Sequence, residues 1–147
     1  MKRSSLLLAA LAALFSASCF SVQAQDPNYT EGTVSQVAAI QITQGHLDEY
    51  MAYVRKEWKP QQEALKKAGV IVDYAVYSTT PRTPNDPDLY LMVTFANMAA
   101  LDNLDARSDP VTEKLTGGRA KDLKGVSDRN AYRKILGVET IRELKVK

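Results

Sequence analysis

Cysteine is almost absent from this sequence of 147 residues, since Cys19 is the only one. Because it lies near the N-terminus, the residues after it can form no disulfide, no thiolate metal site and no cysteine nucleophile. Histidine is equally scarce: His46 stands alone, which excludes a metal site built from several histidines. We therefore predict no bound metal and no resident cofactor, and we expect the fold to be stabilised by packing.

The sequence also lacks an apolar run of the roughly 20 residues that a membrane-spanning helix needs. A shorter apolar run, Leu6–Phe15, follows the positive charges of Lys2 and Arg3, which is the order of a secretory signal. Residues 22–24 offer small or modest side chains at the positions that signal peptidase reads. We predict cleavage after Ala24 and a periplasmic or secreted protein with no membrane span.

A lipid anchor on Cys19 is the competing prediction for this segment, because small residues precede the cysteine. Lipoprotein signals resemble one another in carrying a leucine or similar residue three positions earlier. Here that position is Ser16, so signal cleavage is the preferred interpretation.

The sequence also has no large excess of charge of either sign. Of 19 basic residues, Lys2 and Arg3 fall within the predicted signal, which leaves 17 basic against 17 acidic residues. This balance predicts no general attraction to nucleic acid or to an anionic membrane. We divide the chain into a signal peptide (1–24), a polar flexible leader (25–32) and one domain (33–147) of ordinary single-domain size.

Hydrophobic patterning predicts the elements of this domain. β-branched runs indicate strands over 33–43, 70–79 and 89–96, and moderate alternation indicates a last strand over 138–146. Apolar residues three or four apart predict a helix over 45–68, interrupted near Trp58 because Pro60 removes a backbone donor. Asn97 caps a short helix, and Asp109 before Pro110 signals another that stops at Gly117. Residues 117–131 receive no assignment.

The resulting order is strand, helix, strand, strand, helix, strand, an α+β arrangement with an antiparallel sheet, as in ferredoxin-like βαββαβ domains. With this order, the segments Gly45–Tyr50, Lys67–Gly69 and Ile141–Leu144 resemble the dimeric α/β-barrel superfamily over about residues 33–146. The resemblance implies a homodimer with its two sheets face to face. Similar proteins include cofactor-independent monooxygenases, haem-handling enzymes and many of uncharacterised function.

The first strand supports such a dimer on physical grounds. Val37 and Ala39 point to one face, and Val34, Ala38, Ile40 and Ile42 point to the other. A single layer of helices would leave one apolar face uncovered, and a partner subunit would cover it.

Two residues are candidates for proton transfer. His46 offers a general base or an axial ligand to haem iron, although an exposed polar residue is ordinary at a helix start. Asp73 interrupts an apolar strand. If its face is enclosed, Asp73 needs a partner such as Arg82 or Arg142, or a raised pKa; if the face is wet, it is simply solvated.

Aromatic side chains with polar tips gather on the first helix and the central strands. They could line a pocket for a flat or phenolic ligand, or pack in the core and a dimer contact. The loop 80–88 contains three prolines and presents Arg82 on a stiff connection. The candidate ligand-binding residues are Tyr50, Trp58, Tyr74, Tyr77, Arg82 and Tyr90.

The preferred function is an exported homodimer of uncharacterised role that binds a small apolar or aromatic ligand between its subunits. The alternative is an enzyme resembling the monooxygenase or haem-handling members of the superfamily. A third hypothesis is an interaction subunit that acts through its proline-rich loop. A phosphate-binding glycine loop and a nucleophile elbow are both missing, so nucleotide-dependent transfer and serine hydrolysis have no support.

Overall fold

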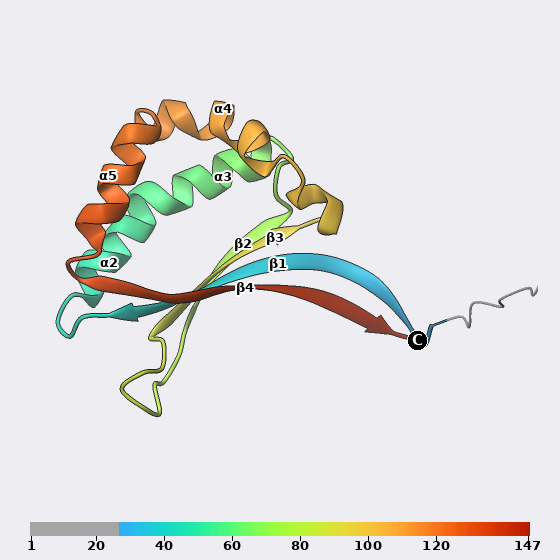
Figure 1. The fold of residues 1–147 in the computed structure, drawn as a ribbon, viewed down its shortest axis with the longest axis horizontal. Helices are drawn as coiled ribbons and strands as arrows, with labels where there is room; N and C mark the ends of the chain where they lie inside the picture. Colours follow the sequence, from blue (N-terminus) through green and yellow to red (C-terminus); the bar gives the residue numbers. More distant parts are fainter. Residues whose placement is uncertain (1–26) are drawn as a thin grey trace, which may run out of the picture.

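The computed structural model describes residues 27–147 and contains one antiparallel sheet (Figure 1). Its strands are β1 (Tyr29–Ile42), β2 (Asp73–Ser78), β3 (Leu89–Phe95) and β4 (Arg133–Val146), in the spatial order β2-β3-β1-β4. A helical segment joins β1 to β2, and a second joins β3 to β4. The predicted α+β fold, ferredoxin-like with an antiparallel sheet, is therefore confirmed.

The first helical segment is interrupted where the sequence predicts. It comprises α2 (Leu47–Tyr53), the π-helical turn η1 (Val54–Trp58) and α3 (Lys59–Lys67). Pro60 has no N–H to donate, and the amide of Lys59 donates to the carbonyl of Val54 five residues back. Gly69 then ends the segment in the left-handed region, at φ 71°.

The second helical segment differs from the prediction. Asn97 caps a short 3₁₀ helix, η2 (Met98–Leu101), its side chain accepting from the amide of Ala100 at 3.0 Å. The next helix, α4 (Leu104–Thr116), carries Pro110 in its interior, so the expected start at Asp109 is wrong. Leu104 and Val111 pack against the core on either side of the proline, and this packing outweighs the local start signal.

Two further boundaries are corrected by the structure. The unassigned residues contain α5 (Arg119–Arg129), a mostly polar helix, and β4 begins at Arg133 instead of Val138. At the other end β1 begins at Tyr29, which pairs with Val146. Residues 29–32, expected in the leader, are therefore part of the sheet.

The core lies between the sheet and the helices, which all cover the same side of the sheet (Figure 1). One cluster joins Ile40, Tyr50, Val54, Leu89 and Leu91, and another joins Leu65, Val70, Ile71 and Phe95. The opposite side of the sheet faces away from every helix in the described part of the chain. The uncovered sheet face that the first strand predicts is thus present.

Candidate functional site

The uncovered sheet face carries apolar side chains from all four strands. Val37 and Ala39 of β1 lie opposite Met92 and Tyr90 of β3, and Tyr77 of β2 lies directly opposite Tyr90. These side chains line a shallow hollow of about 520 Å³, which we call the sheet-face hollow. Its defining residues are Val37, Ala39, Tyr77, Tyr90, Met92 and Ile141.

Polar groups are sparse on this face. Ser35 and Thr94 are buried and share a hydrogen bond of 2.9 Å between their hydroxyl oxygens. Among the described residues that line the hollow, Glu139 is the charged one. Half of Tyr77 and half of Ile141 are exposed, at 50% and 49%. In a subunit alone in water, the exposure of these two side chains costs free energy.

Trp58 and Tyr74 lie in a different place, between the first helical segment and the edge strand β2. Their rings meet edge to face at 5.5 Å between centroids. They line a second apolar hollow, the Trp58 hollow, of about 520 Å³ together with Met51, Val54, Arg55 and Val76. The Tyr74 hydroxyl donates to Glu63, and this hydrogen bond raises the pKa of Tyr74 to about 12.

Tyr50 is a core residue that is 1% exposed. Its ring packs beside Tyr53 and edge-on to Tyr132, at 5.6 and 6.5 Å between centroids. Burial raises the pKa of Tyr50 to about 12. Of the six predicted ligand residues, Tyr50 is therefore the one least able to touch a ligand.

His46 precedes α2 and makes two side-chain contacts. Its Nδ1 lies 2.8 Å from an oxygen of Glu49, and its ring stacks on Tyr132 at 5.9 Å between centroids. The side chain is 44% exposed. The structure thus joins His46 to a carboxylate, but does not bring it to Asp73 or to the sheet-face hollow.

Asp73 is exposed, which is the wet alternative of the prediction, and it pairs with Lys66 at 2.8 Å; neither Arg82 nor Arg142, the partners expected for an enclosed face, contacts it. The hydrogen bond from Lys66 lowers the pKa of Asp73, which favours its ionised form. Arg142 pairs with Glu31 instead. Arg82 stands in the loop after β2, where its amide donates to Asp86 at 2.8 Å.

A third hollow involves Tyr53, one of the aromatic residues of the first helix, together with residues that the sequence did not single out as a site. It lies between the α2–α3 segment and the α4–α5 pair and measures about 780 Å³; we call it the helix hollow. Its defining residues are Tyr53, Pro60, Leu115, Gly125, Arg129 and Tyr132. No local signal marks it, because Arg129 belongs to the polar segment whose helix was not predicted.

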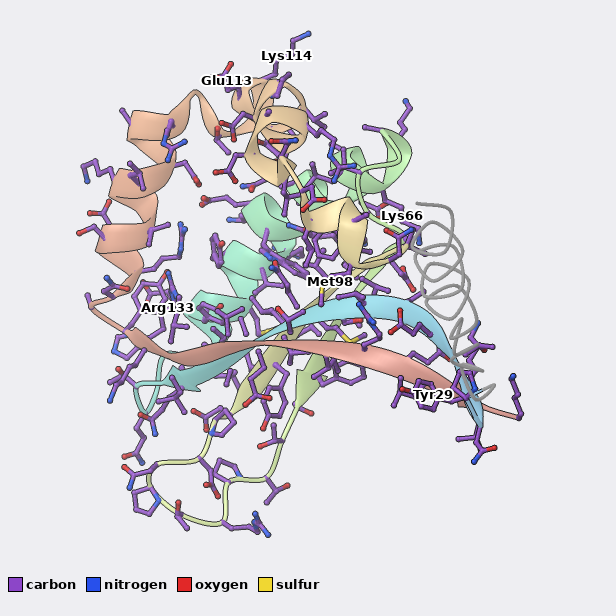
Figure 2. The ribbon with its side chains drawn as sticks, turned by 45° about the vertical axis from the view of Figure 1, so that its right-hand side comes forward. Tyr29, Lys66, Met98, Glu113, Lys114 and Arg133 are labelled. Atoms are coloured by element: carbon purple, nitrogen blue, oxygen red, sulfur yellow. The ribbon has the colours of Figure 1, made fainter. Side chains whose placement is uncertain are left out.

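The arginine in this hollow is buried against an aromatic ring. The guanidinium carbon of Arg129 lies 3.9 Å from the centroid of Tyr53, a cation–π contact. Arg133 is buried nearby, at the start of β4 beneath α5 (Figure 2). The pKa values of Tyr53 and Tyr132 are both raised, because burial is the largest effect. The positive charges of Arg129 and Arg133 oppose this increase in part.

Within residues 27–147, no group of three or more histidine, cysteine or acidic side chains is placed to hold a metal ion. In the same range no helix is both long and apolar enough to cross a bilayer.

No protein-family model matches this chain, and no curated protein matches it in sequence. Several solved structures match this chain. HapK from Hahella chejuensis is 9% identical, with 75% of this chain and 91% of that chain covered and a TM-score of 0.49. A nipsnap family protein of unknown function from Agrobacterium tumefaciens is 12% identical, with 79% and 90% covered and a TM-score of 0.48.

A dimeric ferredoxin-like protein from an uncultured marine organism is 15% identical, with 80% of this chain and 98% of that chain covered and a TM-score of 0.48. These likenesses concern the fold alone. The element order and strand order of this chain define it as a ferredoxin-like α+β protein. The fold that the resemblance to the dimeric α/β-barrel superfamily implies, one antiparallel sheet in βαββαβ order, is present in this chain.

Proposed function

We propose that this protein is an exported homodimer that binds a small apolar or aromatic molecule between two facing sheets. The observation that carries the proposal is the apolar sheet face, which spans four strands and which no helix of residues 27–147 covers. Monomeric proteins rarely expose contiguous apolar patches larger than a few hundred Å². A partner is the usual way to remove such a face from water.

A second copy of the chain fits this face better than an unlike partner. In a twofold dimer the same patch meets itself, so a patch of one charge would repel its own copy. Here the lining of the hollow is apolar except for Glu139, and Asp73 at the edge of the face is already paired with Lys66. An apolar lining is complementary to itself.

The ligand is proposed to lie in the space that the two sheet-face hollows enclose. Tyr77 and Tyr90 would supply flat walls with hydroxyl tips, and Glu139 would supply a polar group. Binding sites for small molecules are mostly apolar, with a few polar groups that fix orientation. A flat ligand with one or two hydroxyl groups suits this lining.

Sedimentation velocity at micromolar concentration tests the dimer. Residues 25–147 should sediment as a dimer, and Tyr77→Glu should sediment as a folded monomer because it places a charge in an apolar contact. Leu123→Glu is the matched control, since Leu123 is an exposed residue of α5, 58% accessible and away from the sheet face. A monomeric wild type, or a Tyr77→Glu variant that stays dimeric, would refute the proposal.

Native mass spectrometry of protein purified from its own compartment tests the ligand. A bound molecule should appear as added mass on the dimer, and Tyr90→Ala should lose it. Wild-type dimer with no added mass would count against a ligand and leave the dimer in place.

Export is proposed from residues 1–24, which lie outside the described residues. The intact mass of the exported protein should match Gln25–Lys147 without modification. A lipid-modified product that begins at Cys19 would support the anchored alternative, and retention of Met1 would refute export by this signal.

A further inference from the structure

The buried charges of the described residues are all of one sign. Arg129 and Arg133 are each 7% exposed, and within residues 27–147 no aspartate or glutamate is buried. A charge taken out of water is costly unless an opposite charge or hydrogen bonds replace the lost hydration. The two arginines therefore call for an anion close to them.

The described residues supply this compensation only in part. Nη1 of Arg129 lies 3.7 Å from Glu57, beyond hydrogen-bond distance, and that carboxylate is 61% exposed. The Nε atoms of Arg129 and Arg133 are buried and have no hydrogen-bond partner among residues 27–147. The Tyr53 ring stabilises one face of the Arg129 guanidinium but accepts no conventional hydrogen bond.

Arg129 is one of the residues that line the helix hollow. The volume of this hollow, about 780 Å³, lies in the range of about 300–1,000 Å³ that is typical of small-molecule sites. Tyr53 and Tyr132 form aromatic walls, and Leu115 and Pro60 add apolar surface. The hollow lies among the helices, on the side of the sheet away from the sheet-face hollow.

A glycine in the middle of α5 makes room for Arg129. A Cβ atom at Gly125 would lie 2.9 Å from Nη1 of Arg129, so any larger residue would push the guanidinium aside. Glycine in a helix interior costs roughly 1 kcal/mol relative to alanine. This cost falls at the position where the side chain of Arg129 folds back along α5.

We propose that the helix hollow binds a small organic acid, with its carboxylate on the Arg129 guanidinium and its aromatic or apolar body against Tyr53 and Tyr132. A planar guanidinium stacked on a ring still has N–H groups along its edge, and these match the two oxygens of a carboxylate. Four acidic residues also line the hollow, and Lys56, Lys121, Lys124 and Arg129 balance them. The lining therefore has no excess positive charge that would favour a doubly charged phosphate over a singly charged carboxylate.

Titration of the full mature chain with benzoate, followed by two-dimensional NMR, tests this site. Benzoate should bind saturably and shift the amides around Arg129. Benzyl alcohol, which has the ring without the charge, should bind at least tenfold more weakly, and inorganic phosphate should also bind more weakly than benzoate. Wild-type protein that shows no saturable benzoate shift would overturn the proposal, as would tighter binding of either control.

Two variants test whether benzoate binds at Arg129. Arg129→Gln should weaken benzoate binding at least tenfold, whereas Arg119→Gln should change it less than twofold. Arg119 is the matched control because it lies on the same helix, is 74% exposed, and contacts Asp109 away from the hollow. Unchanged affinity in Arg129→Gln would place benzoate elsewhere and overturn the assignment.

Gly125→Ala keeps the test decisive if Arg129→Gln fails to fold. Alanine favours the helix, so the variant should unfold at the same or a higher temperature than the wild type. It should nevertheless weaken benzoate binding several-fold, because the new methyl group displaces the guanidinium. Full benzoate affinity in this variant would show that the position of Arg129 does not matter and would refute the proposal.

Discussion

Tyr77 and Tyr90 lie directly opposite each other on β2 and β3, on the face of the sheet away from the core residues Leu89 and Leu91. Tyr77 lies on the edge strand β2, where it is half exposed and lines the sheet-face hollow. Cross-strand aromatic pairs contribute only about 0.2–1 kcal/mol within one sheet. The larger contribution of these two rings is expected from contact with a second subunit or a ligand.

Truncation of these rings separates the two kinds of contact. If they pack against the partner, Tyr77→Ala should raise the dissociation constant of the dimer at least tenfold, as measured by sedimentation. If the two rings contact only a ligand, Tyr77→Ala should stay dimeric, and the added mass of the ligand should disappear in native mass spectrometry. A variant that keeps both the dimer and the ligand would exclude Tyr77 from either role.

Alkaline pH should destabilise the fold through Tyr50. Burial raises the folded-state pKa of Tyr50 from 10.0 to about 12, so its contribution is fully present below pH 10 and is lost as the pH rises towards 12. A shift of this size corresponds to a loss of about 3 kcal/mol. Urea unfolding between pH 9 and pH 12 measures it.

The free energy of unfolding of Tyr50→Phe should therefore fall by about 3 kcal/mol less than that of the wild type over the same pH range. Tyr29→Phe is the control because Tyr29 is 41% exposed at the start of β1. Equal alkaline losses in the wild type and Tyr50→Phe would show that Tyr50 does not couple folding to pH.

Two glycines of the helical segments should respond in opposite ways to alanine. Gly69 has a positive φ of 71°, which an alanine adopts only with strain, so Gly69→Ala should destabilise the protein by roughly 1 kcal/mol. Gly125 has helical neighbours and should tolerate alanine without loss. Thermal unfolding of the two variants checks the contrast, and a stabilised Gly69→Ala variant would contradict it.

His46 is expected not to act as a haem ligand. Its Nδ1 contacts Glu49 and its ring stacks on Tyr132, and it does not line any of the three hollows described above. Addition of haem should produce no visible absorption band that disappears in His46→Ala. A band that does depend on His46 would revive the haem-handling alternative.

Local patterning predicted those parts of the fold in which one residue dictates backbone geometry or several share a face. Pro60 marks the interruption of the first helical segment because it lacks an N–H, and Gly69 marks the end because it tolerates positive φ. Pro110 shows the limit of such signals. It resembles a helix start after Asp109, yet α4 continues through it because Leu104 and Val111 pack on the core.

The candidate sites were less predictable, because hollows form between segments that are distant in sequence. The six predicted ligand residues are divided between the sheet-face hollow, the Trp58 hollow, the core and the loop after β2. Arg129 was missed because arginine in a polar segment is ordinarily solvated. Its burial depends on Tyr53, which lies 76 positions earlier in the chain.

By itself, the sequence determined the strand and helix order, the apolar character of both sheet faces, and the scarcity of histidine and cysteine, since each follows from residue type and spacing along the chain. Only the tertiary structure decided which side chains share a hollow and which charges leave water. Packing brings α5 over the first helical segment, and burial there turns an ordinary arginine into a cation in need of an anion.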